Sequence, residues 1–61
     1  MTAGGIPCQL WSHQFPHTHT KTHTNYPDGG LGGHGNCRNP DGDLAPWCYT
    51  TDPDLAWDFC N

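Results

Sequence analysis

The 61-residue chain has few of the residues that build an ordinary hydrophobic core. Valine is absent, and the large aliphatic residues other than Met1 are Ile6, Leu10, Leu31, Leu44 and Leu55. A chain this short buries only about 60% of the surface that its unfolded form exposes, so small domains often depend on cross-links. We therefore expect one domain, in which three Trp, two Tyr and two Phe residues supply most of the buried area.

Long apolar runs and basic residues are scarce as well. No segment approaches the roughly 18 apolar residues of a membrane-spanning helix, and the first residues do not resemble a signal peptide. Lys21 and Arg38 are the only fixed cations beside six Asp residues, which gives a net charge of −4. Because no long apolar run is present, we expect no membrane insertion. Phosphate binding needs a basic surface, so a nucleic-acid partner is not expected either, and a cationic partner suits the negative charge of the chain better.

A helical pattern is also missing, whereas turn residues are frequent. No window of the sequence repeats its apolar residues at the helical period, and eight Gly and six Pro interrupt the chain. The alternating His and Thr residues of 17–24 suit an extended segment, because β-branched Thr favours strands. We expect loops and turns with a few short antiparallel strands, for which 47–51 and 56–60 are the best candidates.

The four cysteines, Cys8, Cys37, Cys48 and Cys60, compensate for the small core. None of them forms a Cys-x-x-Cys pair, which argues against a zinc ribbon or a thioredoxin-like redox site. In a small, loop-rich chain this pattern indicates a disulfide-rich fold with two bridges, formed in an oxidising compartment. The spacing allows three connectivities and does not choose among them. Because no secretion signal precedes the first cysteine, we expect the chain to be part of a longer extracellular protein.

The sequence gives no support for catalysis. It contains no Ser-His-Asp set with a nucleophile elbow, and oxidised cysteines offer no thiolate. Asp41 and Asp43 could in principle act as acid and base, but a loop domain without a deep cleft gives a substrate nowhere to bind. We therefore predict that the chain is not an enzyme and needs no cofactor.

Several short motifs follow one another along the chain. They are Cys8-Gln9-Leu10-Trp11, Pro16-His17-x-His19, Asn25-Tyr26-Pro27, Gly30-Leu31, Cys37-Arg38-Asn39-Pro40-Asp41, Pro46-Trp47-Cys48-Tyr49-Thr50-Thr51-Asp52-Pro53 and Trp57-x-Phe59-Cys60. In this order and spacing they resemble the motifs of one extracellular family, the kringle domain, over residues 2–61, which is nearly the whole chain. The fibronectin type II module shares a Pro-Trp-Cys-x-Thr-Thr element but is shorter and lacks the Asn-Pro-Asp run.

The chain departs from the kringle pattern at its ends. A full kringle has six cysteines, and the first and last, which pair with each other in the family, are absent here. The resemblance then implies the pairs Cys8–Cys48 and Cys37–Cys60, each contributing about 3–4 kcal/mol by loop entropy. We expect residues 8–61 to form a single truncated kringle domain, preceded by a flexible lead-in over residues 1–7.

The resemblance also implies a lysine-binding site. Kringles that bind lysine have two aspartates at the positions of Asp41 and Asp43 and an aromatic trough at those of Trp47, Tyr49 and Trp57. A lysine side chain is an ammonium on an apolar stem, so carboxylates beside an aromatic surface suit it. The alternative is that Asp41-Gly42 is only a turn and that the aromatic rings are core. Trp11 is expected to be core, packed with Leu31.

The opposite, cationic pole of such a site is incomplete. Lys21 occupies one family position, but Ala56 stands where an Arg would supply a second cation, and Arg38 is expected to be structural. We predict a monomeric extracellular module that binds a partner protein through an exposed lysine, internal or C-terminal, and binds small ω-amino acids weakly. The alternative is a kringle with a silent lysine site that serves as a spacer or binds through another surface.

The histidines allow a further alternative. On an extended segment His17, His19 and His23 would share one face, and imidazoles so placed can bind Zn, Cu or Ni. However, His17 and His19 lie at positions where kringles commonly have histidine, so a structural role is the simpler account. We predict no functional metal site, and the remaining alternative is a His-rich metal-binding fragment that is unfolded without its outer bridge.

Overall fold

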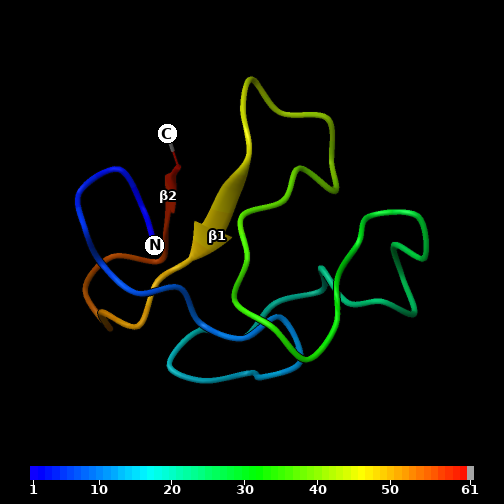
Figure 1. The fold of residues 1–61 in the computed structure, drawn as a ribbon. Helices are drawn as coiled ribbons and strands as arrows, with labels where there is room; N and C mark the ends of the chain where they lie inside the picture. Colours follow the sequence, from blue (N-terminus) through cyan, green and yellow to red (C-terminus); the bar gives the residue numbers. More distant parts are fainter. Residues whose placement is uncertain (61) are drawn as a thin grey trace.

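The computed structural model describes residues 1–60, so position 61, the last of the predicted domain, lies outside the described residues. The secondary structure consists of two short strands, β1 (Trp47–Tyr49) and β2 (Trp57–Phe59), joined in an antiparallel pair (Figure 1). The remainder of the described chain is loops and turns, which confirms the predicted fold class. Residues 1–60 contain no helix long and apolar enough to cross a membrane.

Both strands are shorter than the predicted ranges 47–51 and 56–60. The Thr50 amide still donates to the Ala56 carbonyl at 3.0 Å, but the buried Thr50 hydroxyl bonds to the carbonyls of Asp52 and Leu55. These side-chain bonds turn the chain directly after β1, because a threonine hydroxyl can replace a strand partner for nearby backbone groups. The connection between the strands is therefore a tight, internally bonded loop.

Strand β1 has neighbours on more than one side of its backbone. Isolated bridges join Arg38 to Trp47 and Cys8 to Thr50, and β2 pairs along the whole of β1. Trp47 both donates to and accepts from the Arg38 backbone, at 2.8 and 3.0 Å. β1 is thus the central element of the domain, and the side chains that it carries are held on a fixed backbone.

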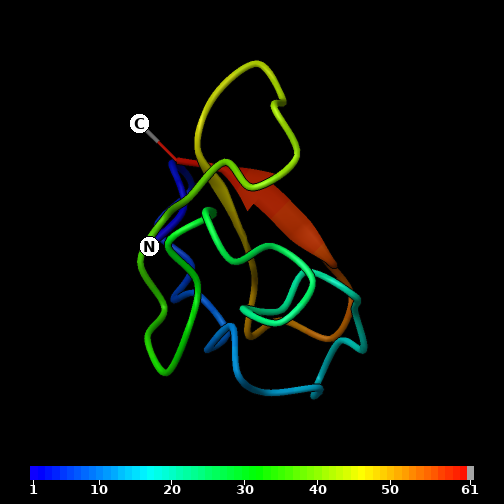
Figure 2. The ribbon, with the colours of Figure 1, turned by 90° about the vertical axis from the view of Figure 1, so that its right-hand side faces the viewer.

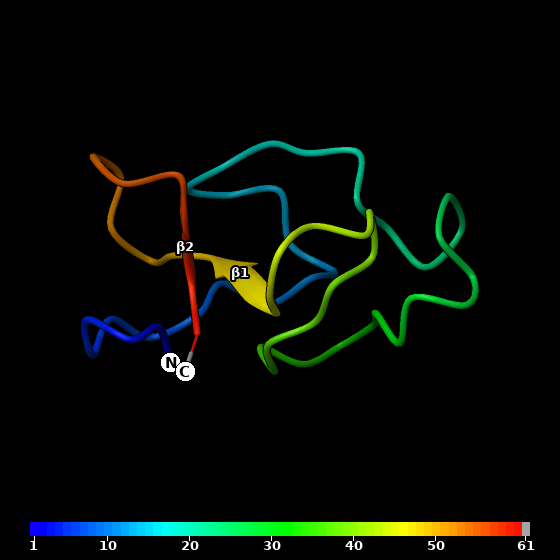
Figure 3. The ribbon, with the colours of Figure 1, turned by 90° about the horizontal axis from the view of Figure 1, so that it is seen from above.

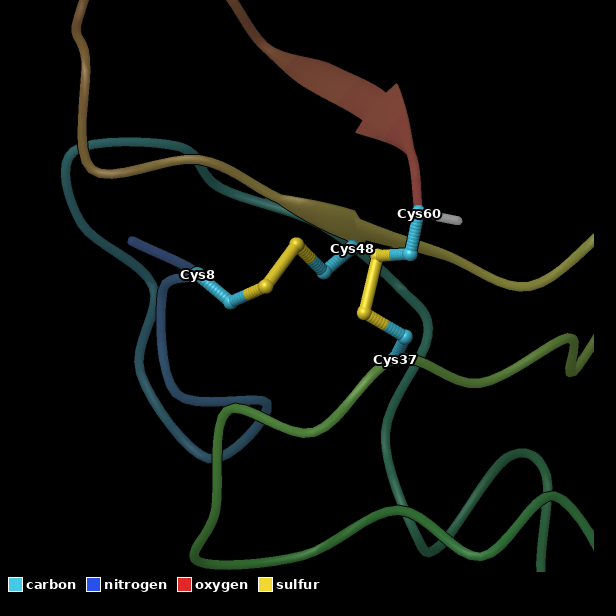
Figure 4. Close-up of side chains that lie close together, drawn as sticks. All are labelled: Cys8, Cys37, Cys48 and Cys60. Carbon is cyan, nitrogen blue, oxygen red and sulfur yellow. A yellow bond between two sulfur atoms is a disulfide. The ribbon is translucent and has the colours of Figure 1, made fainter. Parts of the chain in front are cut away.

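The disulfides join Cys8 to Cys48 and Cys37 to Cys60, the same pairs that the kringle resemblance implies (Figure 4). Their sulfur atoms all lie within 4.8 Å of one another, so the two bridges pack together in the centre of the domain. The buried core is completed by Trp11, Leu31 and Trp47, and the predicted packing of Trp11 with Leu31 in one core is found. The Trp11 indole nitrogen donates to the Asn36 carbonyl at 2.8 Å.

Residues 1–7, which we expect from the sequence to be a flexible lead-in, make hydrogen bonds to the rest of the domain. The Ala3 amide donates to the Phe59 carbonyl of β2 at 3.0 Å, and the Thr51 amide donates to the Pro7 carbonyl at 3.0 Å. Thr2 is only 3% exposed. Seen from above, the first residues form a loop on one side of β2 (Figure 3). The polar and glycine-rich sequence of this segment does not indicate these hydrogen bonds.

Candidate functional site

The two candidate aspartates lie in a loop that projects from the domain just before β1 (Figure 2). The Asn39 side chain closes this loop: its amide nitrogen donates to the Asp43 carbonyl and its oxygen accepts from the Asp43 amide, both at 2.7 Å. Gly42 has a φ of +71°, a left-handed conformation that favours glycine. The Asn-Pro-Asp-Gly-Asp sequence thus builds a clamped turn, and we call residues 39–46 the acidic loop.

Each aspartate of the acidic loop uses one carboxylate oxygen within the protein. The Trp47 indole nitrogen donates to Oδ1 of Asp41 at 3.1 Å, and the Leu44 amide donates to Oδ1 of Asp43 at 2.7 Å. Both residues are exposed. Within residues 1–60 neither carboxylate forms an ion pair with Lys or Arg. The acidic loop therefore presents two negative charges that remain available to an external cation.

The antiparallel register places four aromatic side chains on one face of the strand pair. Trp47 pairs with Phe59 and Tyr49 with Trp57, and paired residues of an antiparallel ladder project from the same face. The Trp47 ring centroid is 5.0 Å from that of Tyr49 and 5.7 Å from that of Trp57. We call Trp47, Tyr49, Trp57 and Phe59 the aromatic face. Cys48 and Asp58 lie on the opposite face.

The members of the aromatic face are not equally accessible. Trp57 is 42% exposed, whereas Trp47 is 4% exposed and packs on Trp11 beneath it. Trp47 therefore offers little surface to a ligand, and its contribution is to hold Asp41 at the edge of the face. Tyr49 is partly buried, and this burial raises the pKa of its phenol above the ordinary value of 10.0. The phenol is consequently neutral at physiological pH.

A histidine that the sequence analysis treated as structural supports Tyr49. The His19 ring stacks on the Tyr49 ring with centroids 4.6 Å apart and an angle of 21° between the planes. His19 Nε2 lies 2.8 Å from the His13 carbonyl, and Gln14 Oε1 accepts from the His19 amide at 2.7 Å. Its position in the Pro-His-x-His motif was the available signal, but the stacking partner could not be read from the sequence.

Lys21 is engaged by a residue that the sequence analysis did not assign to the site. Its ammonium donates to the Tyr26 hydroxyl at 3.2 Å and lies 5.1 Å from the centroid of the Tyr26 ring. The pKa of Lys21 is raised, chiefly by this hydrogen bond and further by the negative charge of Asp41 and, at the high pH at which its phenol ionises, by that of Tyr49. Lys21 thus lies within electrostatic reach of the aromatic face and the acidic loop, with Tyr26 restraining it.

The remaining residues considered for the cationic pole behave as expected from the sequence. Arg38 donates to the carbonyls of Gly30 and Cys37, at 3.3 and 2.8 Å, so its guanidinium holds loops together. Ala56 is exposed and contributes no charge. Of the candidates for this pole within residues 1–60, Lys21 is the one whose charge acts on Tyr49 of the aromatic face.

The three histidines suggested as metal ligands are not gathered into a site. His17 Nε2 is bonded to the Asp52 carbonyl and His19 Nε2 to the His13 carbonyl, each at 2.8 Å. Among residues 1–60 the only set of three or more potential ligands within reach of one another is the four cysteines. Those sulfurs are used in the two disulfides, which leaves no thiolate for a metal.

The exposed ring of the aromatic face, Trp57, does not line the hollow found in the domain. A hollow of about 300 Å³ lies elsewhere, between residues 25–29 and 39–40, and neither Trp57 nor Tyr49 lines it. A ligand on the aromatic face would therefore keep part of its surface in water. Such an arrangement suits a side chain presented by another protein better than a small molecule that must be enclosed.

Comparison with known proteins identifies the fold that carries this site. A family model described as the kringle domain matches residues 1–61. The chain belongs to the kringle family. The chain is 55% identical over 60 residues to plasminogen of Capra hircus, covering 98% of this chain and 48% of that protein. It is 50% identical over 60 residues to an apolipoprotein(a)-like protein 2 of Homo sapiens, covering 98% and 45% respectively.

The chain therefore spans about half the length of the curated relatives it matches. A kringle is a non-catalytic, disulfide-rich module that generally binds proteins. The match begins at residue 1, in agreement with the hydrogen bonds that join the first residues of this kringle to β2.

Proposed function

We propose that this kringle is part of an extracellular protein and binds a partner protein through an exposed lysine side chain. The observation that carries the proposal is the hydrogen bond between Trp47 Nε1 and Asp41 Oδ1. This bond fixes an exposed carboxylate at the edge of an aromatic face whose outer ring, Trp57, is accessible. An anionic group beside an exposed aromatic surface is the complement of a lysine side chain.

The chemistry of lysine matches this arrangement in two parts. The ammonium would lie between Asp41 and Asp43, where the carboxylate oxygens that are not used internally accept its hydrogens. The apolar stem would lie across Trp57 and Tyr49, because lysine methylenes pack readily on apolar surface while the charged end stays near water. Attraction between the cation and the aromatic rings adds about 0.5–2 kcal/mol, depending on how far the pair is desolvated.

The other end of the site determines which lysines are bound. Among residues 1–60, Lys21 is the Lys or Arg side chain whose charge acts on Tyr49 of the aromatic face; Tyr26 already holds its ammonium, and Ala56 supplies no charge. A carboxylate on the ligand would therefore add only the ~0–1 kcal/mol of an exposed ion pair. Internal lysines of a partner should bind nearly as well as C-terminal ones. Small ω-amino acids should bind weakly, with dissociation constants of about 1 mM to tens of μM.

Three small ligands test the proposal by tryptophan fluorescence. Nα-acetyl-lysine methylamide represents an internal lysine, ε-aminocaproic acid adds a carboxylate, and Nα-acetyl-norleucine methylamide removes the ammonium. We expect the first two to bind within about fivefold of each other, because the carboxylate meets one exposed cation, and the norleucine compound to give no saturable change. Equal binding of the lysine and norleucine compounds, or saturation by none of the three, would overturn the proposal.

One observation favours the alternative of a silent lysine site. Trp47 is almost completely buried, so the accessible aromatic surface is narrower than three aromatic positions suggest. If the site is silent, a variant with Asp41→Asn and Asp43→Asn should bind a partner protein as tightly as the natural chain. If lysine is the ligand, the same variant should lose binding to the partner and to the lysine amide together.

A further inference from the structure

Leu44, the most exposed large apolar side chain among residues 1–60, lies next to the proposed lysine site. Leu44 follows Asp43 in the acidic loop and is 93% exposed. Ala45 and Pro46 come next, so the chain from the second aspartate to the start of β1 is wholly apolar. Consecutive Cα atoms are about 3.8 Å apart, which keeps Leu44 within one residue of the anionic pole.

Leu44 is held in this exposed position by defined hydrogen bonds. Its own amide donates to Oδ1 of Asp43 at 2.7 Å, and the Asn39 side chain clamps Asp43 by its amide and its carbonyl. At the other end of the apolar segment, the Cys60 amide donates to the Pro46 carbonyl at 3.0 Å. The loop backbone is therefore preorganised, so binding a partner at Leu44 costs little conformational entropy of the loop.

Leu44 also has no evident role in the folded domain. The core consists of Trp11, Leu31, Trp47 and the cysteines, and Leu44 is outside it. The acidic loop projects away from that core (Figure 2). A single exposed leucine is common on protein surfaces, but here its backbone amide is hydrogen-bonded, its side chain is 93% exposed, and it directly follows an aspartate that has one carboxylate oxygen free of the bonds described above. Those three properties together distinguish it from an incidental surface residue.

We propose that Leu44, with Pro46 beside it, forms an apolar subsite next to the anionic pole. It contacts a large apolar side chain that neighbours the bound lysine in the partner. The partner segment thus contains a lysine adjacent to a residue such as Leu, Ile or Phe, and the acidic loop contacts both side chains. This inference rests on the proposed lysine binding and adds a second determinant of partner choice to it.

Short peptides of matched length measure the subsite separately from the lysine site. The probes are acetyl-Ala-Lys-Ala-amide, acetyl-Leu-Lys-Ala-amide and acetyl-Ala-Lys-Leu-amide, titrated by isothermal calorimetry. Removing about 40 Å² of apolar surface from water gives a fivefold gain in affinity. We expect one of the leucine peptides to bind the natural chain at least about fivefold more tightly than the alanine peptide, with a more negative heat-capacity change.

The variant Leu44→Ala should remove this gain and leave the affinity for the alanine peptide unchanged. Phe15→Ala is the matched control, because Phe15 is also a largely exposed apolar residue (69%) but lies outside the acidic loop. It should retain the full preference for the leucine peptide. Near-ultraviolet circular dichroism in the tryptophan region should be the same for both variants and the natural chain, since neither residue is buried in the core.

The outcomes separate the two proposals. Equal affinities for all three peptides, or a leucine preference that survives Leu44→Ala, would overturn the apolar subsite while leaving lysine binding intact. If the alanine peptide does not bind but a leucine peptide binds in a Leu44-dependent manner, Leu44 binds apolar side chains without a bound lysine beside them, which overturns the lysine proposal and the lysine-adjacent subsite that rests on it. If no peptide binds, both proposals are overturned.

Discussion

The substitution Asp41→Asn separates the interaction of Asp41 with a lysine ammonium from its hydrogen bond with Trp47. The asparagine side chain keeps an oxygen in place of Asp41 Oδ1, so the 3.1 Å bond from the Trp47 indole nitrogen can persist. The negative charge is lost, and the second oxygen, which we propose accepts a hydrogen from the ammonium, is replaced by an NH2 group that can only donate. An exposed ion pair contributes about 0–1 kcal/mol and a hydrogen bond to a charged group about 1.5–3 kcal/mol. For this partly open site we expect a loss near 1.4 kcal/mol, which is about tenfold in the dissociation constant of Nα-acetyl-lysine methylamide.

The comparison with Asp41→Ala extends the argument to stability. Alanine removes the acceptor as well, so Trp47 loses its partner and the free energy of unfolding should fall by about 0.5–1.5 kcal/mol. Asp41→Asn should leave urea denaturation unchanged. Asp54→Asn removes the same charge from an exposed position in the loop between β1 and β2, and it controls for the effect of net charge. If Asp41→Asn and Asp54→Asn weaken lysine binding equally, the reasoning that places the ammonium at Asp41 is wrong.

Three further predictions follow from the contacts around the site. Lys21→Met should weaken the binding of ε-aminocaproic acid by no more than about fivefold and leave the affinity for Nα-acetyl-lysine methylamide unchanged, as measured by fluorescence titration. An equal loss of affinity for both ligands would contradict the role of Lys21. Because burial raises the folded-state pKa of Tyr49, its contribution to stability is complete below pH 10.0 and is lost as pH rises through the folded pKa. Tyr49→Phe should reduce the decline of unfolding free energy above pH 10.0, and an unchanged decline would exclude this phenol as its source. Thr50→Val should lower the unfolding free energy by about 0.5–1.5 kcal/mol in urea denaturation, because it removes the hydrogen bonds that the buried Thr50 hydroxyl makes with the Asp52 and Leu55 backbone; an unaltered midpoint would show that water replaces the hydroxyl.

Much of the fold could be predicted because its determinants are local or covalent. Glycine and proline positions fix the turns, and the β-forming Trp47-Cys48-Tyr49 segment between Pro46 and the Thr50 turn is a strand in the structure. The predicted strands are too long because strand propensity does not show that the Thr50 hydroxyl bonds to the Leu55 carbonyl and turns the chain there. The sequence does not indicate the hydrogen bonds of residues 1–7 for a similar reason, since they are made by backbone groups that every sequence possesses.

In the candidate site, the sequence predicts which residues could take part but not how exposed their side chains are. Residue identities indicated which side chains could meet a lysine, but identity does not fix exposure. Trp47 and Trp57 are chemically alike and lie on one face, yet Trp47 packs on Trp11 and Trp57 lies at the surface. Likewise, the contact between Lys21 and Tyr26 depends on the path of an irregular loop, for which the sequence has no periodic pattern. Long-range packing therefore decided what composition and spacing left open.

Proton–nitrogen correlation NMR of the oxidised protein, titrated with Nα-acetyl-lysine methylamide, tests the central claim most directly. The three tryptophan indole groups are natural reporters, because the Trp47 indole bonds to Asp41, the Trp57 indole is at the accessible surface, and the Trp11 indole bonds to the Asn36 carbonyl in the core. We predict saturable shifts of the Trp47 and Trp57 indole signals and of the backbone amides of the acidic loop, while the Trp11 signal moves little. Saturable shifts confined to other parts of the molecule, or none at concentrations up to several times the expected weakest dissociation constant of about 1 mM, would contradict lysine binding at this site.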